Sequence, residues 1–526
     1  MSSMVRPRHN GNGAVAEAGI ARSTTPLPTE PQRPALGGGN GIGNGSNGTW
    51  KWAATAVLGF LALCLLALPS MAMRAGDGGV SLEEKDCGPQ AADGKATPRF
   101  SEYCNAPVGK GAEGRPPRKE LSLRAVALTI RHGDRSPIHA IPGALPSQGR
   151  FSCASVELES TWSKLPERFR AVSVDSGAPI DRTMRPELRP GGVDEECDFG
   201  QLTARGFAQH LELGAHLAKA YRGLVEALAV GGGASGALYI RSTDYTRTLG
   251  SAAALLTTLL PWRIWPTSAV PLDVAVHEDE ADEVMHGIGA KTSSKGTDGS
   301  AERVVHGACA AAVRHSTAQR ELWHNPEAEF ESLRDLFGEE AYRRGVTEIV
   351  DTLYAAACHG LPPPRGPGGC AEAGLAAALA RSADEYYCAR FAGEGGGAEG
   401  TYLAMQPFLA EVLARLQRGA VGAGPELAVF SGHDTVVAPV LSALGVYKGR
   451  LCGWPPYASR VAFELYSTPP QATDAGTHYV RMVYNGEAVL GVRGCSDGVE
   501  LCPLENFTHG IQSLLGGKPD LATACQ

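Results

Sequence analysis

The run RHGDRSP at residues 131–137 contains the residues best suited to chemistry, and it directly follows the apolar segment 121–130. It places one histidine, His132, between the guanidinium groups of Arg131 and Arg135. Neighbouring positive charge keeps an imidazole neutral, and guanidinium groups bind phosphate oxygens in a bidentate manner. The run therefore predicts that His132 attacks a phosphorus atom while the two arginines hold the phosphate.

Two later segments supply matching polar groups at points where short apolar segments end. The segment 426–430 leads into His433 and Asp434. The segment 237–240 leads into Arg241. All three apolar segments have the length of buried strands, and in an open α/β sheet the ligand crevice lies at the carboxyl ends of the parallel strands. We therefore expect the three motifs to meet at one edge of a sheet.

These motifs, in this order, resemble those of the histidine acid phosphatases, the second branch of the histidine phosphatase superfamily, from near residue 121 to near residue 515. The resemblance implies an α/β fold with a central mixed, largely parallel sheet, flanking helices and an inserted helical cap. It implies a phosphomonoester hydrolase with His132 as the nucleophile, which forms a phosphohistidine, and Asp434 as the proton donor. The implied substrate-binding residues are Arg131, Arg135, Arg241 and His433.

The expected reaction needs no metal ion and no other cofactor, because the arginines supply the positive charge. We expect His433 to be protonated through its anionic neighbour Asp434. Arg247 is expected to pair with an acidic neighbour such as Asp244 and not with phosphate. Gly133 is expected to let the backbone approach the substrate, while the serine and proline that end the run shape the loop.

The C-terminal third narrows the resemblance to one group within the family. Its segments 439–445, 460–465, 483–486 and 502–506 are similar to those of members that remove the 2-phosphate from xylose in the glycosaminoglycan–protein linkage region. The alternatives are a phosphatase of broad specificity or one that acts on lysophosphatidic acid, because residues 265–400 resemble no particular member. A third alternative is an inactive domain that binds phosphorylated glycans, although both histidine motifs are intact.

The segment 52–73 carries no charged residue and is long enough to span a bilayer as one helix. We expect it to be an uncleaved signal-anchor, and a signal peptide cleaved after Ala72 is the alternative. Residues 1–51 are rich in Gly, Asn, Pro and Ser and are expected to be a disordered cytosolic tail. Residues 74–120 are expected to be a lumenal stem, followed by the phosphatase domain 121–526 with its cap at about 265–405.

The cysteines indicate the orientation of the chain in the membrane. Of the 13 cysteines one lies in the apolar segment and the others all follow it. This even set is typical of disulfides in an oxidising lumen, and no spacing typical of a zinc site occurs. Together with the resemblance it predicts a type II Golgi membrane protein that is glycosylated at Asn506 but not at Asn44 or Asn47. Cys104 is expected to pair with Cys87 or to tie the stem to the domain.

The net charge of −8 and the absence of basic runs predict no nucleic-acid partner; the expected partners are a phosphorylated glycan or other phosphomonoester and a membrane.

Apolar periodicity predicts a helix that begins after Thr203 as its N-cap and reaches residue 224, with His210 as a packing residue. Further helices are expected at 251–260, 405–418 and 436–444, and an antiparallel strand pair at 460–466 and 478–484.

Overall fold

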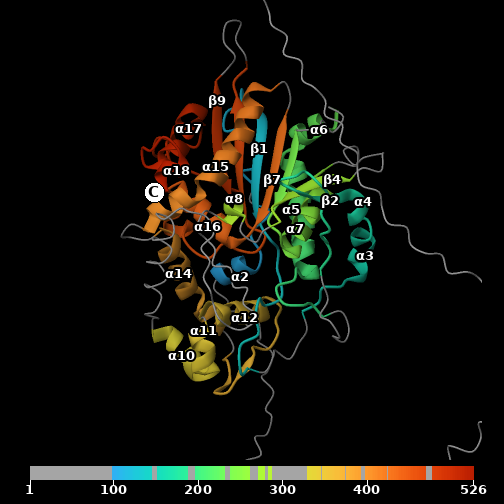
Figure 1. The fold of residues 1–526 in the computed structure, drawn as a ribbon, viewed down its shortest axis with the longest axis vertical. Coiled ribbons are helices and arrows are strands. Elements are labelled where there is room, and N and C mark those ends of the chain that lie inside the picture. Colours follow the sequence, from blue (N-terminus) through green and yellow to red (C-terminus); the bar gives the residue numbers. More distant parts are fainter. Residues whose placement is uncertain are drawn as a thin grey trace, which may run out of the picture. The chain divides into compact units, whose positions relative to one another are not determined.

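Figure 1 shows the fold of the chain, taken from a computed structural model. The residues that the model describes belong to one unit, Glu84–Gln526. They are 98–109, 111–144, 151–186, 196–230, 237–260, 271–278, 282–286, 328–344, 346–372, 375–392, 397–422, 425–469 and 477–525. The predicted tail and the predicted membrane segment 52–73 lie outside these ranges. Among the helices within them, none is long and apolar enough to cross a membrane.

A sheet of nine strands lies at the centre of the unit, in the order β10-β9-β8-β1-β7-β3-β4-β2, with β11 paired to β9. Its parallel strands are β1 (Ser122–Arg131), β7 (Glu426–Gly432), β3 (Leu238–Ser242), β4 (Leu272–Val276) and β2 (Phe169–Ser173). Its antiparallel strands are β8 (Arg460–Ser467), β9 (His478–Tyr484), β10 (Glu487–Val489) and β11 (Cys502–Pro503). The mixed sheet and the antiparallel pair are confirmed, but the sheet is not largely parallel, because its antiparallel part is almost as large.

Two parallel strands were not expected from the sequence. β2 lies in a region for which no strand was predicted, and β4 lies inside the range 265–405 that was expected to be a helical cap. Both strands have only five residues, and β4 has only two buried side chains. Such short segments give no long apolar run, so the pattern missed them. The range expected for the cap therefore includes a strand of the central sheet.

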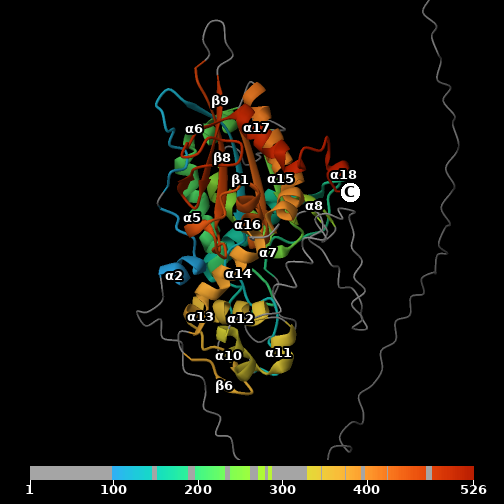
Figure 2. The same ribbon diagram turned by 90° about the vertical axis from the view of Figure 1, so that its left-hand side faces the viewer.

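Helices cover both faces of the sheet, because each strand presents alternate side chains to opposite faces. Val126 and Leu128 of β1 belong to the apolar cluster on one face, and Ala125 and Ala127 to the cluster on the other. The helices of the first face are α5 (Ala204–Ala220), α6 (Arg222–Val230) and α7 (Thr246–Leu259). Those of the second face are α15 (Gly397–Val421), α16 (Asp434–Ala443) and α17 (Leu504–Gln512). Figure 2 shows the sheet between these two groups.

The predicted helices correspond to observed ones, but the helix predicted to reach residue 224 ends at Ala220, and α6 follows it. Thr203 is the N-cap of α5, since its side chain accepts a hydrogen bond from the backbone N–H of Gly206. The helices expected at 251–260 and 405–418 are α7 and α15, which begin earlier than the apolar periodicity indicated. The helix expected at 436–444 is α16, which begins directly after His433.

The remaining elements include a group of helices that the chain inserts before α15. These elements are α2 (Pro98–Cys104), α3 (Val156–Trp162), α4 (Leu165–Arg168), α8 (Glu283–His286), α10 (Ala328–Phe337), α11 (Glu339–Arg344), α12 (Val346–Cys358), β5 (Arg365–Gly366), β6 (Gly369–Cys370), α13 (Leu375–Ala378), α14 (Ala380–Ala392), the short 3-10 helices Gly449–Leu451 and Ser513–Leu515, and α18 (Leu521–Ala524). In both views α10, α11 and α12 lie beyond one end of the sheet.

Residues 98–120 pack against the domain, although the sequence suggested that they belong to a stem. Tyr103 and Ala106 are buried, and the buried carboxylate of Glu113 forms an ion pair with Arg460 of β8. A disulfide joins Cys104 to Cys358 at the end of α12. This bond ties the segment to the domain, which is the second of the two alternatives expected for Cys104.

Other disulfides hold loops in several parts of the domain. They join Cys153 to Cys197, Cys388 to Cys452 and Cys495 to Cys502, and Cys370 and Cys525 are also disulfide-bonded. The prediction of a disulfide-bonded domain is therefore confirmed for these cysteines.

Candidate active site

Strands β1 and β7 are neighbours and end at the same edge of the sheet, since Arg131 pairs with Gly432 in their register. The next residue after each of these strands is a histidine. The rings of His132 and His433 have centroids 5.4 Å apart in a T-shaped arrangement, and both side chains are buried. The structure therefore brings the first and third sequence motifs together at the carboxyl edge of the parallel strands.

Hydrogen bonding and charge both make His132 a neutral nucleophile. Its Nδ1 lies 2.8 Å from the carbonyl oxygen of Gly133. A carbonyl oxygen can only accept, so Nδ1 carries the proton and Nε2 keeps its lone pair. Burial, and then the charges of Arg131 and Arg247, lower the pKa of His132 well below its ordinary value. The ring can therefore attack through Nε2 without first losing a proton.

Two contacts from α5 fix the backbone around His132. His210 is fully buried, and its Nε2 donates to the carbonyl oxygen of Arg131 at 3.1 Å, which is the packing role expected for it. Burial lowers the pKa of His210 to about 4, so it supports the strand as a neutral ring. A Cβ atom on Gly133 would lie only 2.3 Å from the carbonyl oxygen of Gly206. Gly133 thus permits the close approach of α5, and its expected role toward the substrate stays a prediction.

Arg131 is fully buried beside two aromatic rings. The centroids of Tyr103 and Tyr457 lie 5.2 and 4.3 Å from its Cζ. Its Nη2 forms an ion pair with Oδ2 of Asp434 at 2.9 Å, and its Nη1 donates to the carbonyl oxygen of Pro455. Despite burial, Tyr103 and Asp434 raise the pKa of Arg131, which therefore stays charged.

Arg135 is held by a carboxylate from the inserted helices. Its Nη1 and Nη2 donate to the two oxygens of Asp351, on α12, at 3.0 and 2.7 Å. Despite burial, Asp351 raises the pKa of Arg135 well above its ordinary value. The Nε of Arg135 is buried and has no hydrogen-bond partner in the described part of the chain. This nitrogen of the guanidinium group therefore keeps an unused hydrogen-bond donor.

Arg241, which the sequence predicted to bind phosphate, is paired with two carboxylates. Its Nη1 donates to Glu411 of α15 at 2.9 Å, and its Nη2 donates to Asp282 at 2.8 Å. Despite burial, these two carboxylates raise the pKa of Arg241. Asp282 also accepts hydrogen bonds from two backbone N–H groups of α8. Arg241 therefore stabilises the start of α8.

Arg247, in the first turn of α7, is one of three arginines whose charges act on both site histidines, with Arg131 and Arg135. It lowers the pKa of both His132 and His433. Its guanidinium group lies over the ring of Tyr245, with Cζ 4.3 Å from the centroid. Burial, and then the charge of Arg135, lower the pKa of Arg247 to about 10. This direction is opposite to that of the other site arginines, whose carboxylate partners raise their pKa values.

The acidic neighbour expected to pair with Arg247 is engaged elsewhere. Both carboxylate oxygens of Asp244 accept hydrogen bonds from Arg182, at 2.6 and 2.8 Å, so the predicted pairing is wrong. The Nε of Arg247 is buried without a hydrogen-bond partner among the residues that the model describes. A bound anion would compensate this charge, so Arg247 is a stronger candidate for phosphate binding than Arg241.

A chain of hydroxyl groups determines which nitrogen of His433 carries a proton. The hydroxyl of Thr248 donates to the carbonyl oxygens of Thr243 and Tyr245, at 2.9 and 2.8 Å. The 3.0 Å contact between the two threonine hydroxyls must therefore use the proton of Thr243. The hydroxyl oxygen of Thr243 then accepts from Nε2 of His433 at 3.0 Å. In the neutral ring this leaves Nδ1 unprotonated.

His433 is neutral in this structure. Burial, and then the charges of Arg247 and His286, lower its pKa well below its ordinary value. The expectation that Asp434 keeps His433 protonated is therefore wrong for the site without an anion. Since a nearby negative charge favours the protonated ring, a bound phosphate would counteract these cations.

Asp434 has two hydrogen-bond donors on one oxygen. Its Oδ2 lies 2.9 Å from Nη2 of Arg131 and accepts from the indole Nε1 of Trp454 at 3.0 Å. Burial alone would raise the pKa of Asp434, but the charge of Arg131 and the hydrogen bond from Trp454 lower it below its ordinary value. The ring of Trp454 stacks on Tyr387 of α14, with centroids 4.7 Å apart. Asp434 is therefore ionised in this state.

Three half-buried residues lie near the ring of His433. The rings of Tyr245 and His286 lie 5.0 and 5.2 Å from the ring of His433. Arg247, which lies over Tyr245, is also half-buried. We call Tyr245, Arg247 and His286 the rim of the site. Among the described residues, no group of histidines, cysteines and carboxylates is arranged to hold a metal ion.

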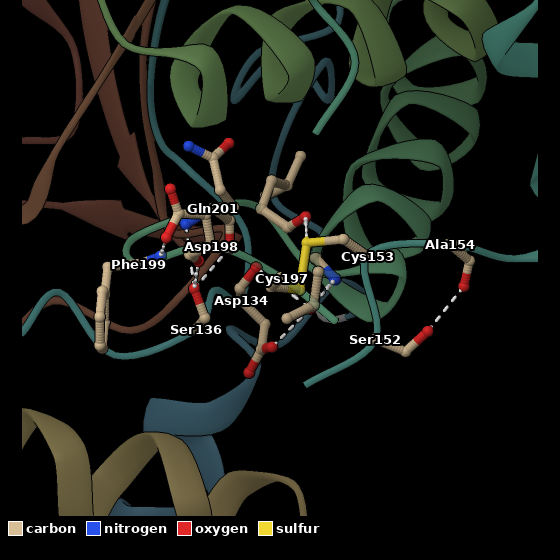
Figure 3. Close-up of a disulfide and its surroundings, with 12 residues drawn as sticks. Asp134, Ser136, Ser152, Cys153, Ala154, Cys197, Asp198, Phe199 and Gln201 are labelled. Carbon is tan, nitrogen blue, oxygen red and sulfur yellow. Dashed lines mark hydrogen bonds between the residues drawn. A yellow bond between two sulfur atoms is a disulfide. The ribbon is translucent and has the colours of Figure 1, made fainter. Parts of the chain in front are cut away.

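Figure 3 shows the support of the RHGDRSP loop by a disulfide-linked segment. The Cys153–Cys197 bond lies directly before the segment that contacts Ser136. The hydroxyl of Ser136 donates to the carbonyl oxygen of Asp198 at 2.6 Å and accepts from the backbone N–H of Gln201 at 3.0 Å. These contacts give Ser136 the role in shaping the loop that the sequence suggested.

The position of Arg247 in the sequence indicated that it could belong to the site. No such indication exists for Asp351 and Tyr103, which were also not predicted. A residue in the first turn of the helix after β3 can reach the strand-end edge, whereas Arg241 lies inside the strand and faces the layer of α15. Asp351 and Tyr103 contact the RHGDRSP loop only because of the tertiary fold. No local pattern marks such a contact.

Comparison with known proteins agrees with this geometry. The family model described as histidine phosphatase superfamily (branch 2) matches residues 122–329 and 381–485, which include the strands before His132 and His433. Counting factor 60 of Dictyostelium discoideum is 26% identical over 436 residues, which cover 80% of this chain and 92% of that protein. 2-phosphoxylose phosphatase 1 of Xenopus tropicalis is 27% identical over 434 residues, 78% of each chain.

Lysosomal acid phosphatase of Bos taurus is 29% identical over 420 residues, which cover 74% of this chain and 78% of that protein. Two of these three relatives are named as phosphatases, and the family model covers more than half of this chain. The chain therefore belongs to branch 2 of the histidine phosphatase superfamily and is a phosphomonoester hydrolase.

Proposed function

We propose that this phosphatase works through a phosphohistidine on His132 and removes phosphate from a sugar, namely the 2-phosphate of xylose in a glycosaminoglycan–protein linkage region. The observation that carries the mechanism is the neutral, buried His132 with its free Nε2 beside cations that carboxylates do not fully compensate. The relatives named 2-phosphoxylose phosphatase 1 support the choice of substrate.

In the first step the phosphoryl group binds to Arg131, Arg135 and Arg247. Nε2 of His132 attacks phosphorus and forms the P–N bond, while the bond from phosphorus to the ester oxygen breaks. That oxygen takes the proton of the carboxyl group of Asp434 and leaves as an alcohol. Phosphate transfer depends mainly on positioning and on charge stabilisation, which the three guanidinium groups provide.

Substrate binding prepares Asp434 for its role as an acid. The carboxylate is ionised while it pairs with Arg131. A phosphoryl group that binds to Arg131 competes with Asp434 for the positive charge of the guanidinium group. It also places negative charge beside the carboxylate. Both changes raise the pKa of the carboxyl group, so it takes up a proton when the substrate binds.

In the second step a water molecule attacks the phosphohistidine. Asp434, now a carboxylate, accepts a proton from this water, the P–N bond breaks, and inorganic phosphate leaves. The electron pair of the broken bond returns to Nε2 of His132. The cycle thus restores the neutral histidine and the protonated acid without any further reactant.

The rim supports a sugar phosphate over a lipid phosphate. We place the sugar of the substrate against the rim, whose residues Tyr245, Arg247 and His286 are half-buried. These side chains offer aromatic faces and hydrogen-bonding groups, which suit the ring and hydroxyls of a sugar. An acyl chain would instead need aliphatic side chains to bury its methylene groups.

The substrate and the nucleophile can be tested together. The full chain and its His132→Ala variant are assayed with a 2-phosphoxylosyl linkage oligosaccharide, an aryl phosphate and lysophosphatidic acid. We expect a preference for the oligosaccharide that the variant loses, with His509→Ala, an exposed histidine on α17, as the unaffected control. Equal turnover of all three esters would reject the substrate but keep the mechanism, and an active His132→Ala variant would reject the mechanism.

We further propose that the chain is a type II protein of the Golgi membrane, anchored by residues 52–73, with its catalytic domain in the lumen. The disulfides support an oxidising compartment. Asn506 is exposed on α17, so an oligosaccharide can reach it in the folded domain. We expect a glycosidase to reduce the apparent mass of the wild type but not of Asn506→Gln, whereas a glycan on Asn44 or Asn47 would contradict this orientation.

A further inference from the structure

We propose that the Cys104–Cys358 disulfide is the centre of a clamp that positions the nucleophile, so that phosphate transfer requires this bond and its neighbour His359. The inference rests on the proposed function, because the clamp holds the loop that carries His132. We call the residues 131–135 the nucleophile loop.

The disulfide joins two helix ends that are remote in sequence but lie beside the nucleophile loop. Cys104 is the last residue of α2, and Cys358 is the last residue of α12. The two cysteines are separated by 254 residues in the sequence, and their Cα atoms are 5.4 Å apart. The adjacent residues Tyr103 and His359 both contact the nucleophile loop.

Each charged residue that flanks the nucleophile is bound by a residue from one of these two helix ends. The hydroxyl of Tyr103 accepts from Nη2 of Arg131 at 3.3 Å. Nε2 of His359 forms a hydrogen bond with Oδ1 of Asp134. The third charged residue, Arg135, is bound through both terminal nitrogens by Asp351 of α12 (Cys358 is seven residues further along this helix). The clamp therefore contacts the nucleophile loop on both sides of His132.

Helix α5 connects the disulfide to the nucleophile loop a second time. The side-chain amide of Gln209 donates to the carbonyl oxygen of Cys104 at 2.8 Å, and its oxygen accepts from the backbone N–H of Asp134, also at 2.8 Å. Nη1 of Arg205 donates to the carbonyl oxygen of Cys358. One buried amide thus spans the distance between the disulfide and the backbone next to the nucleophile.

Burial makes this arrangement sensitive to small displacements. Asp134, Arg135, Gln209 and Asp351 are all at least 95% buried. Water cannot replace a lost partner at such positions, so these hydrogen bonds persist only while α2 and α12 keep their spacing. The line of attack of Nε2 on phosphorus depends on that same loop, and a shift of about 1 Å can reduce a rate about a hundredfold.

Another disulfide of the domain provides a matched control. Cys495 and Cys502 are separated by only seven residues, and Cys502 belongs to β11 at the antiparallel part of the sheet. The described residues around this bond include Val480, Val499 and Phe507, none of which belongs to the active site. Its removal changes the number of disulfides by one, as removal of the clamp does, without touching the nucleophile loop.

The first experiment compares two double variants of the full chain in mild detergent, Cys104→Ser with Cys358→Ser and Cys495→Ser with Cys502→Ser. We measure kcat and KM for an aryl phosphate, the rate of phosphohistidine formation by rapid quench, and the Tm. The clamp variant should lose about tenfold or more in the rate of phosphohistidine formation at a temperature where it remains folded. The control should stay within about twofold of the wild type. A folded clamp variant with the wild-type rate would overturn the proposal.

Single variants keep the test decisive if the clamp variant fails to fold. His359→Ala removes the contact with Asp134 and leaves the disulfide intact, whereas the amide of His359→Gln can still donate to the carboxylate. We expect the rate of phosphohistidine formation to fall about tenfold in His359→Ala and to recover largely in His359→Gln, at similar Tm. A structural role alone would move Tm and not this rate, and an unchanged rate in His359→Ala would reject the clamp.

Measurement of phosphohistidine in the wild type and in the clamp variants separates failure of the inference about the clamp from failure of the proposed function. If the wild type forms no phosphohistidine with any ester, the proposed function fails. If the wild type forms one and the clamp variants form it equally fast, only the inference about the clamp fails.

Discussion

Two sets of buried or half-buried arginines in the described part of the chain differ in how their charge is compensated. In the first set, at the carboxyl edge of the parallel strands, Arg131 and Arg135 have carboxylate partners while Arg247 lies over a tyrosine ring. In the second set, on β8 and β9, Arg460 pairs with Glu113 and Arg481 pairs with Glu464 and Glu500. The second set also donates to several backbone carbonyl oxygens.

In the second set the carboxylate of Glu464 has further donors besides Arg481. The two oxygens of Glu464 accept from Tyr221, from Tyr466 and from the backbone N–H of Gly114. In the first set the charges of Arg131, Arg135 and Arg247 act on the neighbouring imidazole rings. They lower the pKa values of His132 and His433. A buried arginine is therefore weak evidence for a site, and uncompensated charge beside a nucleophile is stronger evidence.

The largest expected effect comes from a change that increases the surplus of positive charge in the first set. Asp434→Asn removes the proton donor, so kcat/KM for a sugar phosphate should fall about a thousandfold. For an aryl phosphate, whose leaving group needs no proton, the loss should be at least about tenfold smaller. Steady-state kinetics with both esters checks this difference, and an equal loss would assign Asp434 a role in binding alone.

Arg247→Ala should reduce kcat/KM for an aryl phosphate about a hundredfold, because it removes a charge that the phosphoryl oxygens would compensate. Arg241→Ala should have a smaller effect on kcat/KM, since that arginine pairs with Asp282 and Glu411. Its main result should be a lower Tm. Kinetics and calorimetry on both variants decide between the two arginines, and a reversed ranking would restore the prediction made from the sequence.

Arg460→Met should reduce the free energy of unfolding by about 3–5 kcal/mol without a large change in kcat, because it leaves the carboxylate of Glu113 buried and unpaired. Denaturant titration measures the loss. The double variant Arg460→Met with Glu113→Leu should recover part of the stability, since neither partner of the ion pair remains. A double variant as unstable as the sum of two single variants would mean that the two residues act independently.

The smallest expected effect concerns Trp454→Phe. The indole hydrogen bond lowers the pKa of Asp434, so its removal raises that pKa. The first step needs protonated Asp434, and kcat/KM therefore decreases as the pH rises through this pKa. The alkaline limb of the pH profile should move to higher pH by less than about one pH unit. A limb that moves to lower pH would contradict the role of this hydrogen bond.

The sequence allowed the nucleophile, the ends of β1 and β7 and the N-cap of α5 to be predicted, because each depends on residues that are close together in the chain. The choice between Arg241 and Arg247 could not be made in this way, since it depends on where β3 ends and which face of the sheet a side chain meets. Asp351 and Trp454 were missed because they reach the site from the inserted helices and from a late loop. Short strands such as β4 were missed because few of their side chains are buried.

The hydrogen bond between Nδ1 of His132 and the carbonyl oxygen of Gly133 has a consequence for the chemical identity of the intermediate. Imidazole can carry a phosphoryl group on either nitrogen, and the two products are distinct isomers with different stability toward acid and nucleophiles. In this loop Nδ1 is occupied by the backbone, so phosphate is carried on Nε2 and the intermediate is the τ isomer of phosphohistidine. Antibodies that distinguish the τ from the π isomer will therefore label the working enzyme with only the first of the two.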